Sequence, residues 1–198
     1  MLSISNLSYF IGGRALYENA NLHIKPKDKI GLVGQNGTGK STLLKIINGD
    51  YLPSSGDVQK AKDCTLGFLN QDLLSYQSDD SILDVALAAF KETLLIQDEI
   101  DQVLKLMETD YSEEVINRLA YLQDRFESNE GYTIKAKAEE VLEGIGFQTS
   151  DLQKPLRQFS GGWRMRVMLA KLLLEKPSLL MLDEPTNHLD LPSIQWVE

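Results

Sequence analysis

Apolar and polar residues alternate along two stretches near the start of the chain, residues 3–8 and 20–24. Alternation with a period of two is typical of a half-buried strand. Gly12 and Gly13 lie between the two stretches and permit a turn. A short apolar run at residues 29–33 predicts a further strand, which leads directly into a glycine-rich loop. The chain is therefore expected to begin with strands and turns.

The spacing of apolar residues changes at Lys40. From there to Ile47 the apolar positions recur at helical spacing, and Gly49 is the expected stop signal for this helix. Strand patterns return near residues 57–60 and 65–70, after a Pro and a Gly have interrupted the chain. The alternation of strands and a helix predicts an α/β fold.

A long helical region begins near Ser81. Residues 81–130 contain neither Gly nor Pro, and their apolar residues recur at three–four spacing. A break at residues 109–112 divides the region into two long helices, with Ser112 as the candidate N-cap of the second. The pattern predicts an αα-hairpin over about residues 81–130, followed by a third helix at about 133–142.

Charge is distributed unevenly along the 198 residues, which carry a net charge of −9. The segment from Asp72 to Glu130 holds fifteen acidic and four basic residues. The acidic balance argues against general affinity for nucleic acids, which depends on clustered Lys and Arg. Cys64 is the only cysteine, so an intrachain disulfide is excluded and a cytoplasmic location is expected. The chain has neither a signal-peptide pattern nor an apolar run long enough to span a bilayer, so we expect no direct membrane insertion.

The sequence GQNGTGKS at residues 34–41 has the composition of a phosphate-binding loop. Gly34, Gly37 and Gly39 let the backbone N–H groups approach phosphates closely. Lys40 supplies positive charge to the β- and γ-phosphates, and the hydroxyl of Ser41 can ligate Mg²⁺. The loop comes directly after an apolar run and opens a helix, which is the context that this motif requires.

A second chemical feature is a pair of acidic residues after the continuous apolar run at residues 179–182. Such a run predicts a parallel strand covered on both faces. Asp183 and Glu184 would then lie at the carboxyl end of the strand, where open α/β sheets bind ligands. Asp183 suits the Mg²⁺ shell, and Glu184 suits polarising or deprotonating an attacking water.

The third feature is FSGG at residues 159–162, at the start of an apolar-periodic run that predicts a helix. Ser160 is a candidate N-cap. Gly161 and Gly162 would weaken the first turn, so their presence suggests that a phosphate or another backbone must come very close. We interpret Ser160–Gly162 as a second phosphate contact.

Together these motifs resemble the nucleotide-binding domain of the ATP-binding cassette (ABC) superfamily. The wording SGGWRMR and EPTNHLD resembles most closely the ABC-F branch, whose members lack membrane spans and act on ribosomes. The resemblance implies a P-loop core with an antiparallel β subdomain, and a helical subdomain that carries an αα-hairpin arm. It places the core at residues 1–72 and 156–198 and the helical subdomain at 73–155. ATP and Mg²⁺ are the implied ligands.

The resemblance also implies roles for individual residues. Ser160–Gly162 would contact ATP held by Lys40 of a second nucleotide-binding domain, in the same full-length chain or in a homodimer. Gln71 matches the residue that couples the γ-phosphate and the metal to the helical lobe. The implied catalytic residues are Glu184, Lys40 and Gln71, and the implied metal ligands are Ser41, Gln71 and Asp183. The implied nucleotide contacts are Gly34, Gln35, Asn36, Gly37, Thr38, Gly39, Lys40, Ser41, Thr42, Ser160, Gly161, Gly162 and Asp190.

In this family an aromatic residue before the first glycine turn normally stacks on adenine. Phe10 is the expected residue and Tyr9 the alternative, because Ile11 occupies the position nearest the glycines. A core role for the aromatic residue is the competing interpretation.

The chain departs from the family pattern in two respects. The family's switch histidine should come one strand after the acidic pair, and neither His23 nor His188 matches it. Family members also carry two nucleotide-binding domains, and this chain has room for one. Both departures are explained if the chain is the N-terminal part of a longer protein, in which case the end of the core sheet is missing and the isolated chain turns over ATP poorly.

Three functions are compatible with these motifs. The first is an ABC-F-type ATPase of translation, because the 89 positions from Gln71 to Ser160 leave room for the arm hairpin. The second is the ATP-binding subunit of a membrane transporter. The third is a clamp or DNA-maintenance ATPase, which the intact Glu184 and the short hairpin disfavour. The acidic arm would repel RNA phosphates and suits a basic protein surface better, although a merely solvated helical face explains its charge as well.

Overall fold

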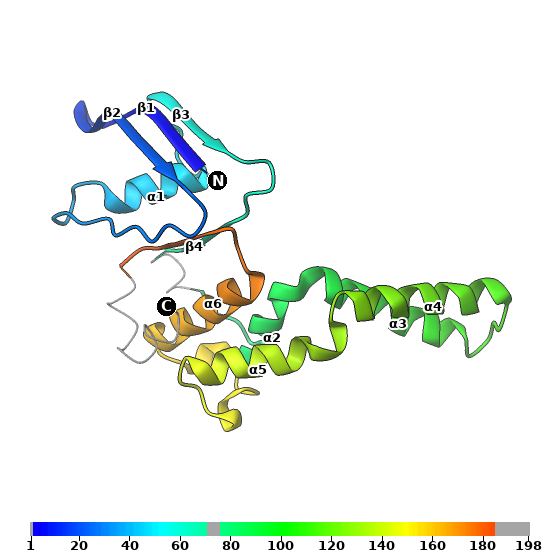
Figure 1. The fold of residues 1–198 in the computed structure, drawn as a ribbon. Helices are drawn as coiled ribbons and strands as arrows, with labels where there is room; N and C mark the ends of the chain where they lie inside the picture. The colour runs from blue at the N-terminus through cyan, green and yellow to red at the C-terminus, as the bar shows by residue number, and fades with distance from the viewer. Residues whose placement is uncertain (1, 71–75, 185–198) are drawn as a thin grey trace. The chain divides into compact units, whose positions relative to one another are not determined.

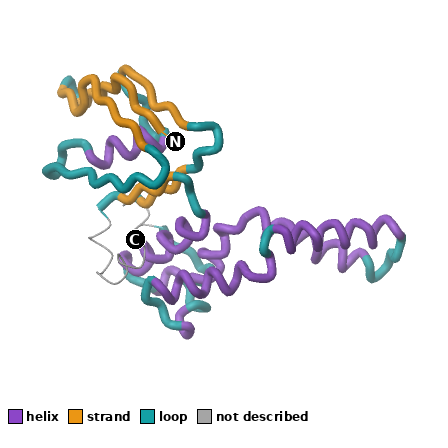
Figure 2. The backbone as a smooth tube through the Cα atoms, viewed as in Figure 1, coloured by secondary structure: helices purple, strands orange, loops and turns teal. Residues whose placement is uncertain are grey.

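The chain forms two compact units in a computed structural model that describes residues 2–70 and 76–184 (Figure 1). The first unit contains residues 2–70 and 176–184, and the second contains residues 76–175. Strands are confined to the first unit, and helices dominate the second (Figure 2).

An antiparallel sheet opens the first unit. Strand β1 (Leu2–Ile11) pairs on one edge with β2 (Arg14–Ile24) and on the other with β3 (Ser55–Lys60). Gly12 and Gly13 connect β1 to β2 with φ angles of 57° and 80°, the left-handed conformation that a two-residue hairpin turn needs. The hairpin expected from the alternating pattern is therefore present.

The rest of the first unit combines one helix with a parallel strand pair. Helix α1 (Lys40–Asn48) ends at Gly49, as the sequence predicts. Strand β4 (Leu66–Leu69) runs parallel to β5 (Leu179–Leu182), although more than a hundred positions separate them along the chain. The core between these elements consists of buried aliphatic side chains: Leu2, Ile4, Leu7, Ile24, Leu43, Ile46, Ile47 and Met181.

The apolar run at residues 29–33 is not a strand, which corrects the sequence prediction. Its side chains are largely in solvent: Ile30 is 53% exposed, and Val33 is 95% exposed. A strand needs a neighbour to accept and donate its backbone hydrogen bonds. No strand in the described part of the chain pairs with this run, so its apolar composition alone does not make it a strand.

The second unit is a helical body from which a hairpin extends. In the body, α2 (Ile82–Leu87), α5 (Ile134–Gly144) and α6 (Gly161–Glu175) pack on one another. The expected domain division placed residues 156–175 with the core, whereas here α6 packs with the helical body. Its buried face, which includes Met165 and Leu169, explains this placement. No helix in the described ranges is both long and apolar enough to cross a membrane.

The hairpin consists of α3 (Lys91–Leu106) and α4 (Glu113–Ser128), which lie against each other (Figure 1). The predicted first helix is broken, because a 3₁₀ turn at Ala88–Phe90 separates α2 from α3. The helices on both sides of the turn have an apolar stripe, because α2 packs in the helical body and α3 packs on α4. The helical spacing of apolar residues therefore continues across the break. The hairpin core is formed by four buried side chains: Ile96, Ile100, Leu122 and Phe126.

Candidate nucleotide-binding site

The glycine-rich loop is held in shape by its own hydrogen bonds. Thr38 Oγ1 donates to the carbonyl oxygen of Gln35 at 2.8 Å. Gly37 and Gly39 have φ angles of 79° and 101°, which side-chain-bearing residues rarely adopt. A Cβ on Gly34 would lie 2.9 Å from Thr38 Oγ1, so a larger residue there would disturb the loop. The loop ends at Gly39, the N-cap of α1.

The Lys40 ammonium lies within this loop. Its Nζ donates to the carbonyl oxygens of Gly34 at 2.8 Å and Gln35 at 3.1 Å. The positive charge is thus positioned at the N-terminus of α1, where the helix dipole also favours an anion. A loop of exposed backbone around a fixed ammonium is suited to binding phosphate groups.

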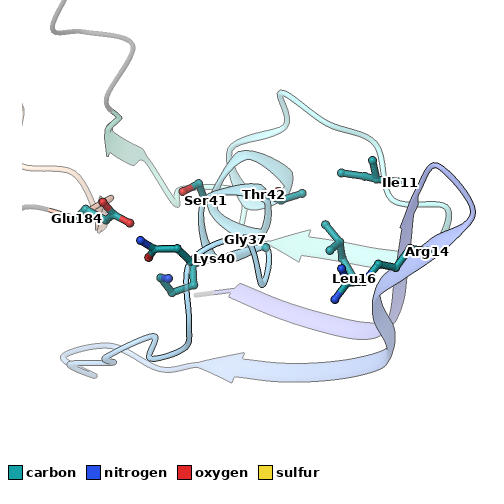
Figure 3. Close-up of a pocket in the computed structure, with 10 residues that line it drawn as sticks. Ile11, Arg14, Leu16, Gly37, Lys40, Ser41, Thr42 and Glu184 are labelled. Carbon is teal, nitrogen blue, oxygen red and sulfur yellow. The ribbon is translucent and has the colours of Figure 1, made fainter.

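A cavity of about 380 Å³ lies over this loop. Figure 3 shows Lys40, Ser41 and Glu184 toward one end of the cavity. The hairpin of β1 and β2 contributes residues at the other end. Of the residues expected from the sequence, the cavity brings together Asn36, Gly37, Gly39, Lys40, Ser41, Thr42 and Glu184.

The two acidic residues at the end of β5 lie in different environments. Asp183 is buried, with 7% of its surface exposed, and its N–H donates to the carbonyl oxygen of Leu69 at 3.0 Å. Glu184 lines the cavity and has a φ of 49°, an uncommon conformation for a residue with a side chain. Such conformations occur where the surrounding fold imposes them, often at functional sites.

Oxygen donors suited to Mg²⁺ are present at the loop and at the end of β5. Mg²⁺ is commonly held by one or two protein oxygens together with phosphates and water. The hydroxyl of Ser41 and the carboxylate of Asp183 fit this donor set. No group of three or more His, Cys, Asp or Glu side chains gathers as a metal site among the residues described.

Phe10 does not line the cavity, although it was the residue expected to stack on adenine. Its backbone N–H donates to Ser54 Oγ at 3.3 Å. The alternative, Tyr9, stacks on Tyr51 with ring centroids 6.2 Å apart. Ile11, the next residue in β1, lines the cavity instead.

Three residues that line the cavity were not predicted from the motifs: Ile11, Arg14 and Leu16. All belong to the hairpin that flanks the Gly12-Gly13 turn. A signal for them was available, because residues on either side of a two-residue turn face each other across the hairpin. None of the three is aromatic, so the family pattern of a stacking aromatic ring does not mark them.

The Ser160–Gly162 segment lies at the start of α6 in the second unit. The Arg164 N–H donates to the carbonyl oxygen of Ser160 at 2.9 Å, which is the first hydrogen bond of the helix. Trp163 contacts the ring of Phe147, with centroids 4.9 Å apart, and the guanidinium of Arg166 lies 4.3 Å from the Trp163 ring. These contacts fix the first turn. The other two expected residues, Gln71 and Asp190, lie outside the described residues.

Comparison with known sequences identifies the domain. A family model described as ABC transporter matches residues 17–187. An uncharacterised ABC transporter ATP-binding protein of Bacillus subtilis, YfmM, is 36% identical over 201 residues, covering all of this chain. ABC transporter F family member 5 of Arabidopsis thaliana is 35% identical over 203 residues, again covering the whole chain. The energy-dependent translational throttle protein EttA of Mycobacterium tuberculosis is 36% identical over 187 residues, or 94% of this chain.

The chain covers only part of each of these relatives: 39% of YfmM, 33% of EttA and 29% of the Arabidopsis protein. Solved structures share the fold. A dimeric bacterial ABC transporter cassette superposes with a TM-score of 0.65 at 21% identity, over the whole of this chain and 81% of the cassette. A dimeric cassette in a post-hydrolysis state, bound to ADP and phosphate, gives a TM-score of 0.63 at 22% identity, with the same coverage of both chains.

Proposed function

Because the chain belongs to the ABC transporter family, we propose that its cavity binds ATP with Mg²⁺ and that the protein hydrolyses the γ-phosphate. The observation that carries this proposal is that Lys40, Ser41 and Glu184 line one cavity. In this proposal Lys40 is the phosphate ligand, Ser41 a metal ligand and Glu184 the carboxylate base, although Glu184 is more than a hundred positions from the loop.

Binding depends on the loop and on the N-terminus of α1. The N–H groups of Gly37 and Gly39 donate to phosphate oxygens, and the helix dipole adds to the attraction. Lys40 shifts part of its hydrogen bonding from the loop carbonyls to the β- and γ-phosphates. Ser41 and Asp183 would hold Mg²⁺, and the ion would supply positive charge that offsets the charge of the phosphates.

Hydrolysis requires a group that orients and activates water. Glu184 is the carboxylate in the cavity, and it accepts a hydrogen bond or a proton from the attacking water. Its φ of 49° sets the direction of the side chain at the end of β5. In this proposal the carboxylate points to the phosphate end of the cavity.

The Ser160–Gly162 segment completes the site of a second domain. We assign it the role of a γ-phosphate contact for ATP held by a second nucleotide-binding domain, in a longer chain or in a homodimer. In support, the glycines leave the start of α6 without side chains that would keep a phosphate away. Solved cassettes with this fold include dimers.

Replacement of Glu184 by Gln tests the hydrolytic role. Loss of a general base lowers a rate by about 10²–10⁴-fold, so the kcat for ATP should fall by at least about a hundredfold while ATP affinity is retained. Glu18→Gln is the matched control, because Glu18 is an exposed carboxylate of the same unit that does not line the cavity. Wild-type turnover by Glu184→Gln would exclude Glu184 as the base.

For the cellular role, we propose an ABC-F-type ATPase that acts on the ribosome in the cytoplasm. EttA, one of the relatives, is described as a translational throttle. The helical hairpin α3–α4 supplies an arm through which such a protein could reach a partner. In this proposal the acidic arm contacts a basic protein surface rather than RNA phosphates, because like charges repel.

The alternative role is that of a transporter subunit, which agrees with the family description and with the solved transporter cassettes. Co-sedimentation separates the two roles. The full protein carrying Glu184→Gln should pellet with ribosomes when ATP and Mg²⁺ are present and should remain in the supernatant without them. Association with membrane vesicles, without any nucleotide-dependent binding to ribosomes, would favour the transporter role instead.

A further inference from the structure

We propose that Phe147, Trp163 and Arg166 are positioning residues, which hold the Ser160–Gly162 segment where it meets the γ-phosphate of ATP bound by a second domain. The proposal rests on the role proposed above for that segment. The three side chains do not contact the nucleotide in this proposal. They act through the backbone of the segment, so their loss slows hydrolysis and leaves the binding of ATP by the Lys40 loop unchanged.

The Ser160–Gly162 segment has little of its own to fix its position. Gly161 and Gly162 have no side chains, and glycine weakens the first turn of a helix. A group that contacts a reacting phosphate must nevertheless be placed accurately, because a displacement of about 1 Å can lower a rate by about a hundredfold. The residues on either side of the segment must therefore supply the positional control.

Aromatic rings flank the segment and contact one common side chain. Phe159 immediately precedes the segment, and Trp163 immediately follows it. Both rings meet the ring of Phe147 edge to face, with centroid distances of 5.5 Å for Phe159 and 4.9 Å for Trp163. Phe147 is buried, with 4% of its surface exposed. The two ends of the segment are thus held against a single buried ring.

The position of Phe147 is set by the way α5 ends, next to α6 in the second unit (Figure 1). The Phe147 N–H donates to the carbonyl oxygen of Leu142 at 3.1 Å, and the Gly146 N–H donates to that of Glu143 at 3.0 Å. This pair of hydrogen bonds is a Schellman motif, which needs a left-handed residue after the helix. Gly146 supplies it with a φ of 104°. The backbone that carries the Phe147 ring is therefore fixed.

Arg166 joins the end of α5 to the first turn of α6. Its guanidinium lies 4.3 Å from the centre of the Trp163 ring, and its Nη1 donates to the carbonyl oxygen of Ile145 at 3.3 Å. A Cβ placed on Gly146 would lie 3.3 Å from the same Nη1, so the guanidinium fits closely against a glycine. A positive charge at the C-terminal end of α5 is also favoured by the helix dipole.

Trp163 is the residue at which positioning can be separated from folding. A purely structural cluster would affect the stability of the second unit, whereas a positioning cluster affects turnover. Trp163 is 37% exposed, and leucine in its place keeps apolar contact and a high helix propensity. Trp163→Leu should therefore fold, while removing the ring that holds the segment against Phe147.

Steady-state ATP turnover by the full protein with Mg²⁺ tests the proposal. Gly161→Asp is the reference for direct damage to the segment, because its carboxylate suits a helix N-terminus but repels a phosphate. We expect Gly161→Asp to lower kcat by at least about tenfold. Trp163→Leu should lower kcat by about three- to tenfold and change KM by less than about twofold. Trp163→Phe, which keeps an aromatic ring, should stay within about twofold of the parent.

The double variant Gly161→Asp/Trp163→Leu shows whether Trp163 acts through the segment. Two changes that act through one group are not additive, so the double variant should be no slower than Gly161→Asp alone. Tyr132→Leu is the matched control, because Tyr132 also meets a phenylalanine edge to face, Phe126 at 5.1 Å, but at the opposite end of α5. It should keep the kcat of the parent.

The positioning role is overturned if Trp163→Leu keeps the parental kcat while Gly161→Asp loses it. It is also overturned if Tyr132→Leu slows turnover as much as Trp163→Leu, or if the losses multiply in the double variant. Parental turnover by Gly161→Asp would refute the role proposed for Ser160–Gly162, and the positioning role with it. A parent protein that hydrolyses no ATP would refute the proposed function as a whole.

Discussion

Replacement of Gly39 by Ala should damage both the stability of the first unit and its affinity for nucleotide. Gly39 has φ 101° and ψ 6°, and a side-chain-bearing residue in the left-handed region costs about 1–2 kcal/mol. The new Cβ would also lie 3.3 Å from the Tyr17 ring, a tight contact that the side chain must relieve by shifting. With a urea m-value of about 2 kcal/mol/M, this cost lowers the unfolding midpoint by about 0.5–1 M.

Gly49 provides a matched control at the other end of the same helix. Its φ of 96° and ψ of 7° nearly repeat those of Gly39, and a Cβ there would meet nothing within 4 Å. Gly49→Ala should therefore show a similar loss of stability in urea titrations. Only Gly39→Ala should also lose ATP affinity, by at least about tenfold, because only Gly39 lines the cavity.

An equal loss of ATP affinity in the two variants would show that Gly39 has no special role in binding. Backbone strain spread through α1, rather than the local geometry of the loop, would then explain both effects. A Gly39→Ala variant as stable as the parent would show that the left-handed conformation at residue 39 imposes no measurable cost on alanine.

Further predictions concern the stability of the two units. Ser81 caps α2, its Oγ accepting the Asp84 N–H at 3.1 Å, so Ser81→Ala should lower the free energy of unfolding by about 1 kcal/mol in urea titrations. Ser112→Ala should cost less, since Ser112 begins α4 without a side-chain cap. Gly131→Ala should lower the thermal midpoint, at a cost of about 1–3 kcal/mol, because its Cβ would lie 2.5 Å from the Phe126 ring; an unchanged midpoint would show that the ring moves freely. Burial raises the pKa of the Tyr17 hydroxyl in the folded state. Its contribution to the free energy of unfolding is therefore complete below the pKa of the unfolded chain and is lost as the pH rises through the folded pKa. If urea titrations at alkaline pH showed the parent to lose no more stability than Tyr17→Phe, this prediction would be wrong.

The parts of the fold and site that could be predicted from sequence are those whose residues impose their own geometry. The glycines at 37 and 39 adopt the left-handed conformations that the loop needs. The apolar run at residues 179–182 forms the parallel strand β5, and Glu184 lies just beyond it in the cavity. The family recognised from these motifs is confirmed by the matching family model and by the relatives.

The parts that could not be predicted depend on partners distant in the chain. Three of the five residues at 29–33 are large and apolar, as in a buried strand, but only β5 has a described neighbour with which to pair. The 3₁₀ turn at Ala88–Phe90 leaves the apolar periodicity intact, because the helices on both sides bury a stripe. The lining of the cavity by Ile11 rather than Phe10 depends on the register of one hairpin, which a single-position shift would reverse.

In the proposed function, the loop around Lys40 binds the phosphates of ATP. Calorimetric titration of the full protein with ATP and Mg²⁺ tests it most directly, comparing the parent with Lys40→Ala. Lys45→Ala is the control, because Lys45 lies on the same helix but does not line the cavity; its Nζ lies 5.8 Å from the centre of the Tyr51 ring. We predict saturable binding by the parent and by Lys45→Ala, and at least about tenfold weaker binding by Lys40→Ala. Equal affinity in all three proteins, or no binding by the parent, would contradict the account.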